Sequence, residues 1–185
     1  RDDGEPVCSI AGLVLFGHSP RQKMRYAGVR WMSFSGVDMS YQAQDDSVID
    51  GPLVALWTGD HRQPSVDDGL IERLSSRMRP FVEVHSDTLQ DGLRRHVGLR
   101  FAAEAVREAM INALVHRDWT RPVEVEIVNY ADRLEVTSPG ALQNSMTIEK
   151  MLAGQRSARN PVIMEVMRDY GYVEQRGMGV RRKIV

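Results

Sequence analysis

The stretch FAAEAVREAMINALVHRDW, residues 101–119, has the pattern around which the rest of the chain is organised. It is rich in Ala, Leu, Met and Glu and contains neither Gly nor Pro, which is typical of a long helix. Apolar residues recur at every fourth position: Phe101, Ala105, Ala109 and Ala113. Larger apolar side chains flank them, so the pattern predicts a mostly buried helix.

A single polar stripe runs along the same helix and consists of Glu104, Glu108, Asn112 and His116. Their spacing of four residues places them above one another on one face. One interpretation is the solvated face of an amphipathic helix. The other is a functional site, because Asn is a poor choice inside a helix and the stripe leads into the polar group 116–118.

The residue types of the stripe suit a metal-bound anion. The amide oxygen of Asn112 is a neutral hard ligand for Mg²⁺, and the carboxylate of Glu108 can orient or deprotonate a water molecule. This chemistry requires oxygen ligands on a rigid helix beside a phosphate-binding loop.

The composition excludes several classes of protein. A net charge of −1 gives no general electrostatic case for binding nucleic acid. The one cysteine, Cys8, excludes a disulfide framework. The apolar run at residues 10–16 is too short to span a bilayer and lacks the flanks of a signal peptide. With 185 residues, the chain suits one domain, or one domain plus a fragment, and we expect it to be cytoplasmic.

The first 50 residues carry two strand patterns, at residues 8–16 and 27–34. Two strands alone are not stable in water. We therefore interpret residues 1–50 as the end of a domain whose beginning is absent. We expect them to pack as a small β unit with few contacts to the remainder.

Helix and strand patterns alternate through residues 51–185. The expected elements are a helix from about residue 65 to Pro80, a strand at 81–85, paired strands at 123–128 and 134–137, and helices at 147–154 and 160–171. Asn160 and Pro161 suit the N-cap and first position of the last helix. A glycine loop at residues 177–179 follows it.

Four strings in this half resemble a known family: REAMINALVHRDW, RLEVTSPGAL, RNPVIMEVM and GMGVRRK. They are similar to the C-terminal ATPase-like domain of bacterial proteins described as RecG-related helicases or transcriptional regulators. That domain is a divergent branch of the GHKL group, which includes DNA gyrase, MutL and the sensor histidine kinases. In the same family an AlbA-like, Schlafen-type domain comes first, and IAGLVLFGHSP resembles its last strands. The resemblance implies an AlbA-like remnant at residues 1–50 and a divergent GHKL ATPase-like domain at 51–185.

The resemblance also implies roles for individual residues. Glu108 would be the general base, and Asn112 would bind both Mg²⁺ and nucleotide. Backbone N–H groups of the loop that holds Gly177 and Gly179 would contact phosphate oxygens. Further nucleotide contacts would come from His116, Asp118, Gly140, Arg159 and Asn160.

The sequence departs from the GHKL pattern at residues 137–141. The usual Asp-x-Gly-x-Gly, whose Asp reads the adenine amino group, is replaced by Thr-Ser-Pro-Gly-Ala. No acid is therefore present at this position to recognise adenine. The chain also contains nothing that resembles a Walker motif or a helicase core.

We expect an α/β (α+β) fold of the Bergerat type, in which helices cover one face of a mixed or antiparallel sheet. The expected function is a nucleotide (ATP)-binding regulatory module of a bacterial DNA-associated protein, a transcriptional regulator. One alternative is an active Mg²⁺-dependent ATPase of a RecG-related DNA-processing protein, and another is a degenerate dimerisation or scaffold module. Expected ligands are ATP and Mg²⁺. Expected partners are DNA, through parts of the full-length protein outside this chain, and a second copy in a homodimer, but no membrane.

Overall fold

The computed structural model describes residues 7–56, 67–86, 96–142, 146–153, 155 and 157–173. Its main sheet has the strand order β2-β1-β5-β6. These strands are β1 (Val29–Ser33), β2 (Asp45–Ile49), β5 (Val125–Asn129) and β6 (Leu134–Thr137). β1 and β5 run parallel at the centre, and both edge strands are antiparallel to their neighbours. The sheet is therefore mixed, as expected.

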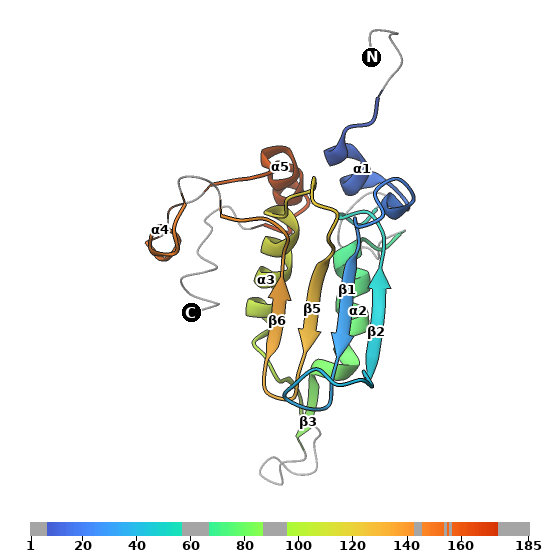
Figure 1. The fold of residues 1–185 in the computed structure, drawn as a ribbon, viewed down its shortest axis with the longest axis vertical. Helices are drawn as coiled ribbons and strands as arrows, with labels where there is room; N and C mark the ends of the chain where they lie inside the picture. The colour runs from blue at the N-terminus through green and yellow to red at the C-terminus, as the bar shows by residue number, and fades with distance from the viewer. Residues whose placement is uncertain are drawn as a thin grey trace.

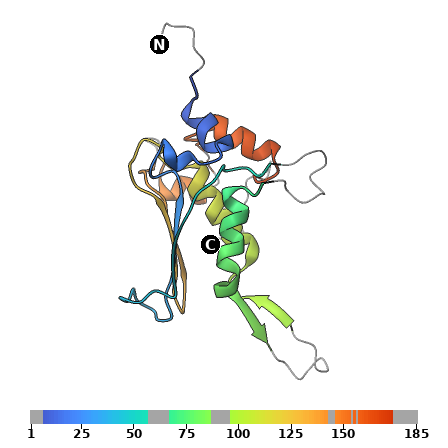
Figure 2. The ribbon, with the colours of Figure 1, turned by 90° about the vertical axis from the view of Figure 1, so that its right-hand side faces the viewer.

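Helices α2 (Leu70–Val82) and α3 (Ala103–Val115) cover one face of this sheet, as the edge-on view shows (Figure 2). Helices α1 (Ile10–Phe16) and α5 (Pro161–Asp169) lie together beyond the end at which β5 begins (Figure 1). The remaining elements are a 3₁₀ turn at Pro20–Gln22, the antiparallel pair β3 (Glu83–Ser86) and β4 (His96–Leu99), and α4 (Ile148–Leu152). This arrangement confirms the expected α/β sandwich. Within the described ranges, no helix is long and apolar enough to cross a membrane.

The alternation of side chains in the central strands positions the core between the sheet and the helices. Trp31 of β1 is paired in register with Ile127 of β5, and both are fully buried. They belong to a cluster that includes Val14, Leu15, Leu74, Met78, Leu114, Ile163 and Met167. This core holds α2 and α3 against the sheet.

A carboxylate at the edge of the sheet links α2 to the central strands. Asp45 of β2 is 8% exposed and accepts a 3.0 Å hydrogen bond from the indole Nε1 of Trp31. The guanidinium of Arg77 on α2 donates to both oxygens of Asp45, each at 2.7 Å. Asp45 is therefore buried with its charge paired.

The N-terminal apolar run forms a helix rather than the expected strand. Residues Ile10–Phe16 make α1, and the hydroxyl of Ser9 caps it by accepting a 3.1 Å hydrogen bond from the backbone N–H of Gly12. A short apolar run does not distinguish a buried strand from a buried helix. β1 instead pairs with β5 and with β2, and β2 was not predicted because its sequence, DDSVI, is polar.

The expected packing of residues 1–50 is also wrong. β1 is a central strand that lies between β2 and β5, and its five residues pair in register with those of β5. Val14 and Leu15 of α1 are buried in the main core, and the carbonyl of Val14 accepts a 2.8 Å hydrogen bond from Leu53. These residues are therefore integrated with the elements that follow them.

Several element boundaries differ from those expected. α2 starts at Leu70 and continues past Pro80, which lies in its last turn, where a missing N–H removes a single hydrogen bond. α3 ends at Val115 instead of continuing to residue 119. β4 lies in a segment for which the sequence patterns predicted no element. The strands at 125–129 and 134–137 and the last two helices lie where the patterns placed them.

Candidate functional site

Three segments far apart in the sequence meet at the C-terminal end of α3. They are the residues that follow the helix, the turn at 138–141 after β6, and residues 159–160 before α5. The backbone N–H of Asp118 donates to the carbonyl of Pro139 at 2.8 Å. The Ser138 hydroxyl donates to the carbonyl of Ala113 in α3 at 2.7 Å. We call the group His116, Asp118, Gly140, Arg159 and Asn160 the α3 terminus site.

Asn160 holds the end of α3. Its side-chain nitrogen donates to the carbonyl of Val115 at 2.7 Å and to the carbonyl of Arg117 at 2.8 Å. Carbonyls at a helix C-terminus lack partners inside the helix, so an amide from outside satisfies them. Asn160 stands at the N-cap position of α5, as expected, but its side chain makes no capping bond to α5. Its side chain instead completes α3.

Gly140 allows the turn at 138–141 to approach Asp118 closely. Its φ of +126° is a conformation that L side chains rarely adopt. A Cβ added here would lie 2.9 Å from the Cβ of Asp118. The carbonyl of the next residue, Ala141, accepts a hydrogen bond from the guanidinium of Arg159. The turn at 138–141 is thus held between the side chains of Asp118 and Arg159.

The carboxylate of Asp118 is already committed to protein donors. The Thr120 hydroxyl donates to it at 2.6 Å, and the Thr120 backbone N–H donates at 3.1 Å. Arg159 lies 3.4 Å from its other oxygen. The side-chain hydrogen bond from Thr120 is the main cause of the lowered pKa of Asp118, and the charge of Arg159 contributes. Asp118 is therefore ionised at neutral pH.

His116 is half-buried one turn beyond Asn112. Burial lowers the pKa of its imidazole below the ordinary 6.5, and the positive charge of Arg159 lowers it further. At neutral pH the ring is uncharged, so it can both donate and accept a hydrogen bond.

Acidification is expected to destabilise the protein through His116. The unfolded chain binds a proton near pH 6.5, whereas the folded chain binds it only at lower pH. The free energy of unfolding should therefore fall as the pH drops through about 6.5. Urea denaturation at about pH 7.5 and about pH 5.5 should show this loss, and His116→Gln should reduce it. Equal pH dependence in the two proteins would contradict this account.

Glu108 and Asn112 contact each other on the same face of α3. The Asn112 side-chain nitrogen donates to Glu108 Oε1 at 3.2 Å, and both side chains are half-buried. In the described part of the chain, the Asn112 amide oxygen has no hydrogen-bond donor. That oxygen is therefore available to a hard cation. The cavity discussed below, and a second one between α2 and the start of α3, are lined by other residues.

Mg²⁺ fits this donor set in one specific way. The described residues contain no group of three or more His, Cys, Asp or Glu side chains that could hold a metal ion. Mg²⁺ often rests on one or two protein oxygens together with substrate phosphates and water. Asn112 can supply such an oxygen, and Glu108 lies beside it. A metal site made by protein side chains alone does not fit.

The structure thus places the candidate residues along one helix and at its end. Glu108 and Asn112 lie on α3, and the five residues of the α3 terminus site lie where α3 ends. Gly177 and Gly179 lie outside the described residues.

Arg117 is a structural residue of this region that the sequence analysis did not single out. Its side chain is 1% exposed, and it donates to the carbonyls of Tyr26 and Val123, the latter at 2.7 Å. Its guanidinium lies 4.5 Å from the ring centroid of Trp119. Burial lowers the pKa of Arg117 to about 10, so it stays charged at neutral pH. The neighbouring Trp119 is the one sequence signal for this burial.

Part of the chain matches a known protein family. Residues 121–185 match the family model described as "Putative ATP-dependent DNA helicase recG C-terminal". This range contains the turn at 138–141, Arg159 and Asn160, and the match supports a RecG-related, ATPase-like domain there. None of the curated proteins matches the chain.

The fold also resembles a solved structure, that of the DIP2311 protein from Corynebacterium diphtheriae. The TM-score is 0.65 at 23% sequence identity, and the match covers 93% of this chain. It covers 31% of the other chain, so the present chain spans about a third of that protein's length. At this identity the likeness concerns the fold alone.

Proposed function

We propose that this chain is an ATP-binding regulatory module of a bacterial DNA-associated protein, a transcriptional regulator. The observation that carries the proposal is the meeting of α3, the turn at 138–141 and residues 159–160 at one end of the sheet. The family match to a RecG-related, ATPase-like domain covers two of these three segments. The third carries Glu108 and Asn112, which supply the oxygen chemistry.

Each residue of the site has a distinct part in this proposal. The Asn112 oxygen would hold Mg²⁺, which offsets the negative charge of the phosphates when it is bound. Arg159 adds a positive charge beside the turn, and Gly140 lets ligand and backbone approach closely. Neutral His116 offers a hydrogen bond at the end of the stripe.

Recognition of the base is the weak part of the site. Residues 137–141 contain no acid, and the nearby Asp118 is held by Thr120 and Arg159. A carboxylate with these partners is a poor acceptor for an adenine amino group. We therefore expect little discrimination between ATP and GTP.

Mapping by NMR tests where the nucleotide binds. Adding ATP and Mg²⁺ should shift the backbone amide signals of His116, Asp118 and Gly140 and leave those of β2 unchanged. β2 lies at the far edge of the sheet from β6 and serves as the internal control. Shifts confined to other segments, or no shifts at all, would contradict the proposal.

An active ATPase is the second candidate, and the Glu108 to Asn112 contact favours it. A general base acts on the attacking water rather than holding the ligand. Glu108→Gln should therefore keep ATP affinity within about threefold and lower phosphate release at least about a hundredfold. Phosphate release at the same low rate in both proteins would leave a binding module without catalysis.

We further propose that DNA contacts come from parts of the full-length protein outside this chain. Residues 1–50 are proposed to descend from an AlbA-like domain, whose β1 has become part of the main sheet. If no nucleotide binds, the remaining candidate is a scaffold that pairs two copies.

A further inference from the structure

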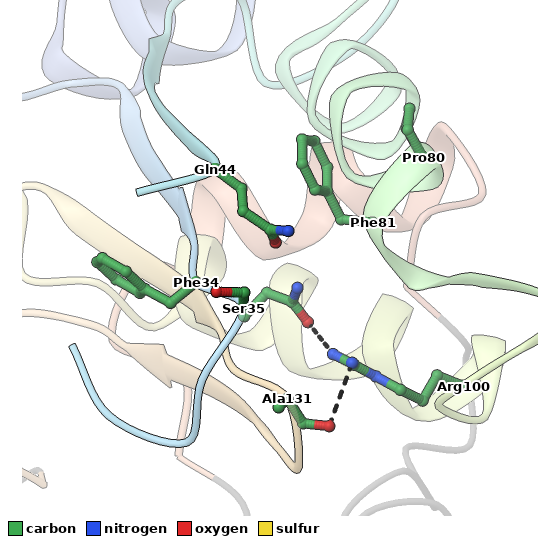
Figure 3. A pocket seen from close by; sticks show the side chains of 8 residues that line it. Phe34, Ser35, Gln44, Pro80, Phe81, Arg100 and Ala131 are labelled. Atoms are coloured by element: carbon green, nitrogen blue, oxygen red, sulfur yellow. Dashed lines mark hydrogen bonds between the residues drawn. The ribbon is translucent and has the colours of Figure 1, made fainter. Parts of the chain in front are cut away.

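A cavity of about 320 Å³ (Figure 3) lies where β1 and β5 end, and the α3 terminus site lies at the other end of the sheet. Its walls come from the ends of β1 and β5, the end of α2 and the residue after β4. The side chains used below are Ser35, Gln44, Phe81, Arg100 and Asn129. In open α/β sheets, ligands bind outside the carboxyl ends of the parallel strands, and both β1 and β5 end here.

Arg100 brings a positive charge to this cavity without a matching acid. Its guanidinium donates to the side-chain oxygen of Asn129, to the carbonyl of Tyr130 at 2.6 Å and to the carbonyl of Ala131 at 3.3 Å. All three acceptors are neutral. In the described part of the chain, no Asp or Glu pairs with Arg100. When these three bonds to described residues are counted, two of its five N–H groups remain for a ligand.

A chain of hydrogen bonds through the buried residues Ser33 and Asn129 connects Gln44 with Arg100, which are both exposed. Asn129 is 2% exposed, accepts from Arg100, and donates to the hydroxyl of Ser33 at 2.9 Å. That hydroxyl donates to the amide oxygen of Gln44 at 3.3 Å. Among the described residues the amide nitrogen of Gln44 has no acceptor, so it can donate to a ligand in the cavity. The polar groups are thus oriented as donors before any ligand arrives.

An aromatic ring forms the apolar wall. Phe81 lies beside the space between Gln44 and Arg100, whereas the ring of Phe34 points away from it (Figure 3). The rings of Trp31 and Phe81 pack against each other in a tilted arrangement, with centroids 5.9 Å apart. A flat group in the cavity could therefore lie against Phe81 while its charged end meets Arg100.

We propose that this cavity binds a small organic carboxylate with a flat, apolar body. The charge of Arg100 and the free amide of Gln44 select the anion, and Phe81 selects the flat body. The volume lies at the lower end of the range for small-molecule sites, so the ligand is small. This inference does not depend on nucleotide binding at the other end of the sheet.

The test is an NMR titration of the 185-residue chain with benzoate, benzamide and inorganic phosphate. Benzoate should bind with a dissociation constant on the order of 1 mM or lower and shift the amide signals of Gln44, Arg100 and Asn129. Benzamide has the same shape without the charge, and phosphate has the charge without the ring. Each should bind at least about tenfold more weakly than benzoate.

Two variants and one control complete the test. Gln44→Glu keeps the acceptor for Ser33 but places a negative charge opposite Arg100, so it should weaken benzoate at least about tenfold while the fold is retained. Arg100→Gln should do the same. Arg30→Gln removes an equal charge from an exposed pair with Asp46 and should leave affinity unchanged.

Any one of the following outcomes would overturn the proposal. They are equal affinity for benzoate and benzamide, equal affinity for benzoate and phosphate, and benzoate shifts that Gln44→Glu leaves unchanged. Absence of benzoate binding at concentrations on the order of 10 mM would overturn it as well.

Discussion

Replacing Arg117 with alanine is expected to lower the free energy of unfolding by about 2–4 kcal/mol. The side chain is almost fully buried and joins the carbonyls of Tyr26 and Val123, which precede β1 and β5. Its loss leaves the carbonyls of Tyr26 and Val123 without this donor and opens a void beside Trp119. Chemical denaturation at pH 7 measures the effect.

Part of this cost should come from the void. Arg117→Met and Arg117→Ala both remove the charge and the two hydrogen bonds, but methionine fills much of the vacated volume, so it should destabilise less than alanine. Arg25→Ala removes an exposed arginine and should change stability by less than about 0.5 kcal/mol. A loss below about 1 kcal/mol in Arg117→Ala would show that the two carbonyls do not need Arg117.

Asn112→Ala should separate nucleotide binding from stability. Alanine is a better helix former, and Asn112 makes its one described side-chain hydrogen bond to Glu108, within the same helix. The protein without nucleotide should therefore keep its stability within about 0.5 kcal/mol. Mg²⁺-dependent ATP affinity should fall at least about tenfold, or about 1.4 kcal/mol, because the metal loses its protein ligand.

A matched control lies on the same polar stripe. Glu104→Ala changes an exposed residue in the first turn of α3 and should leave ATP affinity unchanged. If Asn112→Ala instead lowers stability by about 1–3 kcal/mol and wild type binds no nucleotide, Asn112 is a structural residue.

The sequence predicted those elements whose patterns are long or strictly periodic. The helix pattern at 101–119 and the alternation at 123–128 gave α3 and β5, because one buried face fixes each period. The run at 10–16 failed because seven apolar residues fit a helix or a strand equally well. β2 failed because an edge strand needs little apolar surface, so DDSVI shows no strand signal.

The site was predictable to a smaller extent. Helical spacing was enough to place Glu108 and Asn112 one turn apart, and the structure adds their contact. Spacing could not show that Asn160 completes α3, because that bond joins segments 45 residues apart. The burial of Arg117 depends in the same way on strands that precede and follow it. The cavity at Arg100 had no sequence signal, since its residues come from five separate segments.

Calorimetric titration of the chain with ATP, with and without Mg²⁺, tests the central claim most directly. We expect ATP to bind with Mg²⁺, to bind at least about tenfold more weakly without it, and to be matched by GTP within about tenfold. In the same titration, Asn112→Ala should bind ATP with the affinity that the wild type shows without Mg²⁺, whether or not Mg²⁺ is present. Wild-type heats that equal those of dilution for every nucleotide would contradict the claim that this chain binds nucleotide.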